Sequence, residues 1–163
     1  MPVLITAGLS PEAYRLKRIL AIDEVVFADQ SPLPQIPGSR SLVIPPYTSS
    51  SFVHEVLKGC LDLGITKIYP LQAGEVTELS KARSLFLEYN VKLIIPSEEW
   101  LKNHEPLVKG SAEDITVLEE GTTVAAEGVS DTISLNNETG VFSGATNGQN
   151  TEYCLYLIED AGI

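Results

Sequence analysis

The sequence predicts an α/β protein: an open, mainly parallel sheet with helices on both faces, followed by a small C-terminal antiparallel β region. In the first hundred residues, short apolar runs alternate with segments of helical period, a pattern typical of a parallel sheet with helical crossovers. The last fifty residues show no helical period, only short β-branched or aromatic runs between turn residues. We therefore expect an α/β domain over residues 1–103 and a β-rich appendage over 104–163.

The chain opens with the first strand–turn–helix unit of such a fold. Residues 3–5 (VLI) are a continuous apolar run, and Thr6-Ala7-Gly8 ends it. Ser10 offers a helix N-cap hydroxyl, and Pro11 suits the first helical position because that residue needs no N–H donor. The apolar residues of segment 11–21 then share one helical face. The turn places backbone N–H groups at a helix N-terminus, where open α/β sheets usually bind ligands.

Four more strands and three more helices are expected in the α/β part. The strands are residues 24–28, 41–44, 65–71 and 91–95. The helices run from residue 52 up to the C-cap Gly64, over 76–89, and briefly over 97–101. The proline-rich segment 30–40 is a loop, so the strand that follows it is expected at an edge of the sheet.

The C-terminal part is expected to form short antiparallel strands. The predicted strands are residues 114–118, 122–127, 132–135, 140–143 and 151–158, separated by turns at 120–121, 136–137 and 144–150. Asn147-Gly148 is a hairpin signal. Because the run CLYLI carries no charge, we expect this region to pack on the first domain or on another subunit. Its apolar runs and unpaired edges predict self-association into a homo-oligomer.

Composition excludes several classes of function. The net charge of −11 opposes binding to nucleic acid or to an anionic membrane surface, because each phosphate contact needs Lys or Arg. No apolar run reaches membrane length and no basic leader precedes one, so a cytoplasmic protein is expected. The two cysteines and two histidines lack metal-ligand spacing, which predicts no metal site. No Ser-His-acid arrangement is recognisable, and no catalytic residue is assigned.

Two candidate ligand-binding segments lie in the first βαβ unit. The turn Ala7, Gly8, Leu9 and Ser10 is either an anion cradle or a plain βα turn, since it lacks the second and third glycines of Gly-X-Gly-X-X-Gly. Asp29 ends the second strand. By its spacing it is either a ribose-binding acid or a loop-capping residue.

A third candidate segment follows the fourth strand. Gln72, Gly74 and Glu75 are expected near the same carboxyl edge of the sheet. Gln72 is suited to orient a carboxylate or amide, and Glu75 to accept from an amine or hydroxyl. The alternative is that Glu75 begins the next helix, where its charge favours the helix dipole.

The order of these segments resembles the N-terminal preATP-grasp domain. That Rossmann-like domain begins ATP-grasp enzymes such as the large subunit of carbamoyl phosphate synthetase. The matching elements, over residues 1–103, are the Gly8 turn, the acidic Asp29, Ile44-Pro45-Pro46, GITKIYP at 64–70, and Gln72-Ala73-Gly74-Glu75. The resemblance implies the fold and a substrate-side cleft.

The chain departs from that family after residue 103. There the family continues into two ATP-grasp subdomains with a Gly-rich phosphate loop, Lys and Arg clamps and acidic metal ligands. Residues 104–163 supply no phosphate loop, and the glycines of 140–148 have no neighbouring Lys or Arg. The resemblance therefore does not imply ATP hydrolysis or ligation by this chain alone.

Three hypotheses of function follow. In the first, the chain is a non-catalytic or accessory module that binds a small polar ligand or a separately encoded ATP-grasp subunit. In the second, it is a small enzyme with Asp29 or Glu75 as general base on a nucleotide- or amino-acid-type substrate. In the third, it is a Rossmann-type nucleotide-binding protein. The sequence identifies no cofactor.

Overall fold

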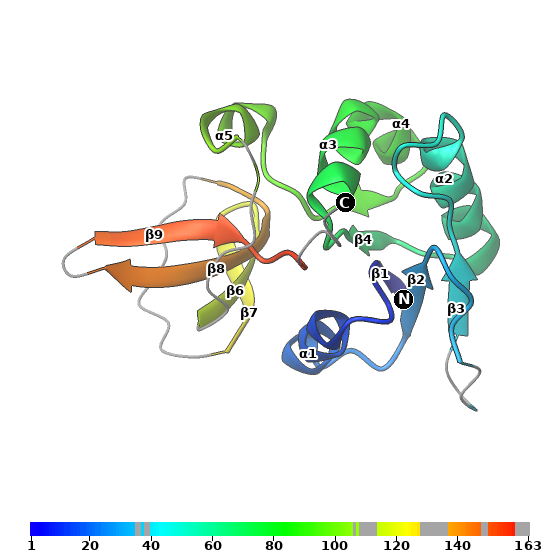
Figure 1. Cartoon of the computed structure of the whole chain (residues 1–163), viewed down its shortest axis with the longest axis horizontal. Coiled ribbons are helices and arrows are strands. Elements are labelled where there is room, and N and C mark those ends of the chain that lie inside the picture. Colours follow the sequence, from blue (N-terminus) through cyan, green and yellow to red (C-terminus); the bar gives the residue numbers. More distant parts are fainter. Residues whose placement is uncertain are drawn as a thin grey trace.

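The computed structural model describes residues 1–34, 37, 40–105, 107, 114–127, 137–147 and 150–158. Two sheets lie side by side in it, one parallel and one antiparallel (Figure 1). The predicted α/β class, with its small antiparallel region, is confirmed. None of the described helices is long and apolar enough to cross a bilayer.

The first sheet has five strands, all parallel to their neighbours. They are β1 (Val3–Ile5), β2 (Val25–Asp29), β3 (Arg40–Val43), β4 (Lys67–Tyr69) and β5 (Lys92–Leu93). Their order is β3-β2-β1-β4-β5, which matches the first five strands of the Rossmann order 3-2-1-4-5-6, and β3 lies at an edge as predicted. The order reverses between β1 and β4, which makes the carboxyl ends of these two strands the topological switch point.

In the described part of the chain, the helices that accompany the strands are α1 (Pro11–Leu20), α2 (Phe52–Leu63), α3 (Ala73–Lys81), α4 (Arg83–Glu88) and α5 (Glu98–Asn103). Successive residues of β1 point to opposite faces of the sheet. Val3 and Ile5 join the core under α1, whereas Leu4 joins the core under α2, α3 and α4. Figure 1 shows α1 on one side of the sheet and α2, α3 and α4 on the other.

The structure corrects the predicted helix over 76–89 and the lengths of two strands. That helix begins earlier, at Ala73, and Ala82 divides it into α3 and α4. The Ala82 N–H bonds the Leu79 carbonyl three residues back, so the four-residue ladder is interrupted there. The predicted strands 65–71 and 91–95 are shorter, at Lys67–Tyr69 and Lys92–Leu93, because only these residues pair with a neighbouring strand.

The second sheet contains β6 (Asp114–Glu119), β7 (Thr122–Glu127), β8 (Gly140–Asn147) and β9 (Asn150–Leu155) in the order β7-β6-β8-β9. The predicted turn over 144–150 was too long, because β8 continues to Asn147, which pairs with Asn150. The hairpin predicted at this point is present, and residues 148–149 lie outside the described part. The predicted strand 132–135 lies outside it too.

The antiparallel sheet shares both hydrophobic cores of the α/β part. Ile115 and Val117 pack in the core that contains Val3 and Ile5. From the other face of the antiparallel sheet, Phe142 contacts the Trp100 ring of α5 edge-on, with 5.4 Å between the ring centroids. The antiparallel sheet and α5 therefore complete the hydrophobic packing of the α/β part.

Candidate functional site

Within the predicted anion cradle, three backbone N–H groups already have acceptors in the chain. The Gly8 N–H bonds the Ala28 carbonyl (2.9 Å), the Ser10 N–H bonds the Ala7 carbonyl (2.8 Å), and the Leu9 N–H bonds Asp29 Oδ2 (3.1 Å). The turn residue with a left-handed backbone is Ala7, with φ of 53°. At Leu9, the Asp29 carboxylate thus takes the place that a bound anion would occupy.

Asp29 also shapes the loop that follows β2. Its Oδ1 accepts from the Gln30 N–H (2.7 Å) and from the Ser31 N–H (3.4 Å). These are the hydrogen bonds of a loop-capping aspartate. Gly8 lies against β2, where a Cβ would stand 2.8 Å from Phe27 Cβ, so glycine is needed there for close packing.

A second polar group lies buried at the switch point between β1 and β4. The Thr6 hydroxyl donates to Glu75 Oε1 (2.8 Å) and accepts from the Leu71 N–H (2.8 Å). Thr6 is 1% exposed and Glu75, in the first turn of α3, is 3% exposed. This link ties the ends of β1 and β4 to the start of α3. Thr6 was missed in the sequence, although it is a polar residue that directly follows an apolar strand.

The other two predicted residues, Gln72 and Gly74, are also partly covered. Gln72 Oε1 is buried and has no hydrogen-bond partner among the described residues. The Tyr47 ring lies where a side chain at Gly74 would stand. Residues 156–158 cross this edge, where the Ile158 N–H bonds the Leu71 carbonyl (2.8 Å). The structure thus brings the predicted residues to one edge of the sheet, where Asp29 bonds the first turn and Glu75 bonds Thr6.

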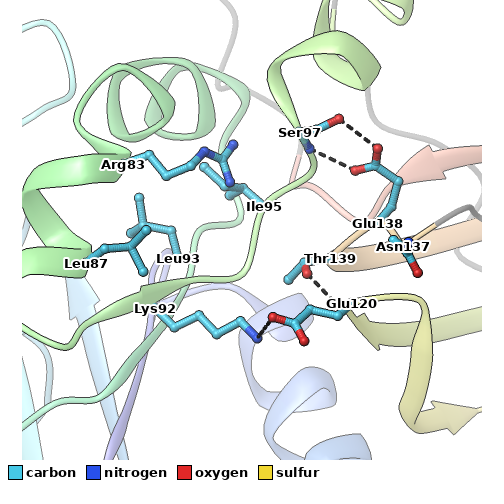
Figure 2. Close-up of a pocket in the computed structure, with 10 residues that line it drawn as sticks. All are labelled: Arg83, Leu87, Lys92, Leu93, Ile95, Ser97, Glu120, Asn137, Glu138 and Thr139. Atoms are coloured by element: carbon cyan, nitrogen blue, oxygen red, sulfur yellow. Dashed lines mark hydrogen bonds and ion pairs between the residues drawn. The ribbon is translucent and has the colours of Figure 1, made fainter.

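A cavity of about 410 Å³ lies elsewhere, between the free edge of β5 and the antiparallel sheet (Figure 2). None of the predicted ligand-binding residues lines it. One wall comes from α4, β5 and the segment after β5, and the facing wall from the β6–β7 turn and the residues before β8. The lining is Arg83, Leu87, Lys92, Leu93, Ile95, Ser97, Glu120, Asn137, Glu138 and Thr139.

Both walls of this cavity carry charged groups. Arg83 is partly buried and donates to the Pro96 carbonyl. Burial lowers its pKa, and the nearby Glu98 and Glu138 oppose that shift. On the facing wall, the Glu138 carboxylate accepts from the Ser97 N–H (2.8 Å) and the Ser97 hydroxyl (2.7 Å).

The floor of the cavity is apolar and borders an unpaired sheet edge. Leu93 and Ile95 are buried, whereas Leu87 on α4 is 58% exposed. The Lys92 N–H donates to the carbonyl of Thr66, which precedes β4, and the Ile94 N–H donates to the carbonyl of Ile68 in β4. The peptide groups of Leu93 alternate with these and point to the free edge of the sheet. The other seven lining residues are polar or charged, so the cavity combines a small apolar floor with mostly polar walls.

The cavity residues were not predicted from the sequence. They come from two regions of the chain, 83–97 and 120–139, and none of them belongs to a local motif. Within the described ranges, no group of three or more His, Cys, Asp or Glu side chains could hold a metal ion. No cofactor is assigned.

The sequence matches no protein-family model and no curated protein. Among the solved structures that resemble part of it are two dehydrogenases. One is a GalE-like L-threonine dehydrogenase from Cupriavidus necator in its holo form, at 16% identity and a TM-score of 0.41, over 54% of this chain and 35% of that one. The other is a partial-consensus L-threonine 3-dehydrogenase, at 18% identity and a TM-score of 0.39, over 54% and 34%. The match thus spans about a third of each dehydrogenase, and similarity at this level carries no inference about activity.

Proposed function

We propose that this chain is a non-catalytic, preATP-grasp-like module that binds a small polar ligand in the cavity between its two sheets. The observation that carries the proposal is the 410 Å³ cavity itself, with charged walls and an apolar floor. The preATP-grasp part of the proposal rests on the order of the sequence segments over residues 1–103.

The acids at the carboxyl edge have structural roles in this proposal. Asp29 accepts from three backbone N–H groups, and Glu75 accepts from the buried Thr6 hydroxyl. A general base must reach the proton that it abstracts from the substrate. At 3% exposure, Glu75 has little access to a substrate from solvent.

The experiment is a thermal-shift screen of ATP, ADP, NAD(P), amino acids and small carboxylates, with and without Mg²⁺. Ligand at 100 times its Kd adds about 2.7 kcal/mol to the free energy of unfolding, which such a screen detects. A ligand of the cavity should bind more weakly to Leu87→Ser and equally well to Asp29→Asn. The reverse pattern would place the ligand at the carboxyl edge. A blank screen would contradict small-ligand binding, and co-purification would then test for a separate ATP-grasp chain.

A nucleotide-binding Rossmann module is the second candidate. The Asp29 carboxylate lies beside the first βα turn, with Oδ2 3.1 Å from the Leu9 backbone nitrogen, in a sheet whose strand order matches the first five strands of the Rossmann order. Under this alternative, titration with NADH raises the nucleotide's fluorescence, and Asp29→Asn weakens that binding. Unchanged NADH fluorescence at millimolar protein and nucleotide would rule this alternative out.

A further inference from the structure

The chemistry of the cavity walls narrows the class of ligand, an inference that rests on the proposed function. Arg83 and Lys92 line one wall, and Glu120 and Glu138 line the other (Figure 2). These four formal charges cancel. A chain with a net charge of −11 repels free anions, so a cavity of balanced charge suits a ligand that carries both signs.

Arg83 is the group of this cavity that can take a carboxylate. Its guanidinium has five N–H donors, and the Pro96 carbonyl is its hydrogen-bond acceptor in the described part of the chain. A guanidinium binds a carboxylate through two parallel hydrogen bonds. Lys92 is less available, because its Nζ lies 3.4 Å from Glu119 Oε1 and 3.9 Å from Glu120 Oε1.

Glu138 offers the opposite charge across the cavity. Each of its carboxylate oxygens accepts one hydrogen bond from Ser97, and a carboxylate has about four lone-pair sites. The remaining sites can accept from an ammonium group. The apolar side chains of Leu87, Leu93 and Ile95 come from the same wall as Arg83. The cavity therefore offers a cation and an apolar surface on one wall and an anion on the facing wall.

We propose that the cavity binds an α-amino acid with an apolar side chain. Its carboxylate pairs with Arg83, its ammonium group with Glu138, and its side chain packs on Leu87 and Leu93. The volume of about 410 Å³ lies within the range of small-molecule pockets.

Isothermal titration with three matched ligands tests this assignment: norleucine, N-acetylnorleucine, which lacks the ammonium group, and norleucinamide, which lacks the carboxylate. We expect norleucine to bind the wild-type protein at least ten-fold more tightly than either analogue. Arg83→Gln should abolish the difference in affinity between norleucine and norleucinamide. Glu138→Gln should abolish the difference in affinity between norleucine and N-acetylnorleucine. Arg83→Lys should retain part of the advantage, because the charge remains without the planar fork.

Lys58→Gln, which removes an exposed cation on α2 outside this cavity, is the control and should leave all three affinities unchanged. Far-UV circular dichroism checks that each variant is folded. Equal weakening of all three ligands by Arg83→Gln would show a merely structural role and overturn the assignment. If no apolar α-amino acid binds but a nucleotide or a simple carboxylate of the thermal-shift screen does, the ligand class is wrong while the binding module stands. If nothing binds, both proposals fail.

Discussion

Thr6 shows how much a single hydroxyl contributes at the switch point. Its hydroxyl donates to the buried Glu75 carboxylate and accepts from the Leu71 N–H, so it provides a hydrogen-bond partner for both of these buried groups. A buried polar group that loses its partner keeps its full desolvation cost. The position is polar for this reason, whether or not the edge binds a ligand.

Thr6→Val should therefore destabilise the protein strongly. Valine has nearly the same shape, so the change removes the hydroxyl without opening a large cavity. We expect a loss of about 1–3 kcal/mol in the free energy of unfolding, measured by urea denaturation. Thr77→Val is the matched control, because Thr77 is exposed and its hydroxyl donates to the Ala73 carbonyl of its own helix. A loss at Thr6 no larger than at Thr77 would show that the link contributes nothing.

Cys60 predicts a pH dependence of stability at alkaline pH. Burial raises the pKa of its thiol from 9.0 to about 12. Above pH 9 the unfolded chain releases this proton while the folded chain keeps it, so unfolding becomes more favourable up to about pH 12. The slope approaches about 1.4 kcal/mol per pH unit.

Urea denaturation of wild type and Cys60→Ala between pH 8 and 10.5 measures this effect. The stability of Cys60→Ala should fall less steeply than that of the wild type above pH 9. Cys154→Ala, which keeps Cys60, should fall as the wild type does. Parallel curves for wild type and Cys60→Ala would contradict the effect of burial on the thiol.

At the scale of elements, charged side chains join the two sheets at one end. Glu119, the last residue of β6, lies 2.9 Å from Lys67 Nζ on β4 and 3.4 Å from Lys92 Nζ on β5. Its side chain is only 16% exposed. Burial raises the pKa of Glu119, but the two lysines outweigh it, and the net pKa lies below 4.5.

Glu119→Gln should destabilise the protein by about 1 kcal/mol at pH 7, a modest figure because both lysines are about one-third exposed and salt screens them. Since the folded pKa is lowered, this stabilisation is present above pH 4.5 and is lost as the pH falls through the folded value. Urea denaturation of the wild type and Glu119→Gln at pH 7 and at pH 3 measures this difference in the free energy of unfolding. Glu78→Gln, which breaks the exposed pair with Lys81, is the control. An equal difference between wild type and Glu119→Gln at both pH values would contradict the ion-pair explanation.

Several elements were predictable because their signals are local. Ser10 accepts from the Ala13 N–H (3.2 Å) and Pro11 begins α1, as the sequence indicates. Glu120 and Gly121 have φ of 52° and 79° in the predicted β6–β7 turn. The division of α3 from α4 at Ala82 was not predictable, because alanine favours a helix and the apolar spacing continues across it.

At the scale of the whole molecule, the two sheets should unfold together. Leu118 and Phe142 of the antiparallel sheet belong to the same core as Val56 and Phe86 of the α/β part. Neither part can lose this contact without exposing apolar surface of the other. A shared core favours a single cooperative transition.

Trp100 makes this testable, because it is the only tryptophan and it packs against Phe142. We expect its fluorescence and the far-UV circular dichroism at 222 nm, which reports mainly the helices, to give coincident urea transitions. The control is Phe142→Leu, which should shift both transitions to lower urea together. A fluorescence transition at clearly lower urea than that of the helices would show that the antiparallel sheet unfolds as an independent unit.

The sequence by itself determined the fold class, the order of its elements and the edge position of β3, because apolar periodicity, proline and capping residues act over a few neighbouring positions. The sequence also predicted that the candidate residues of three turns lie at one edge of the sheet. Only the tertiary structure decided which hydrogen bonds these residues make. The Asp29 carboxylate accepts from the Leu9 N–H, and the Glu75 carboxylate accepts from the Thr6 hydroxyl. The tertiary structure alone placed Arg83 and Glu138 on facing walls of one cavity, because no local sequence pattern encodes how the two sheets pack.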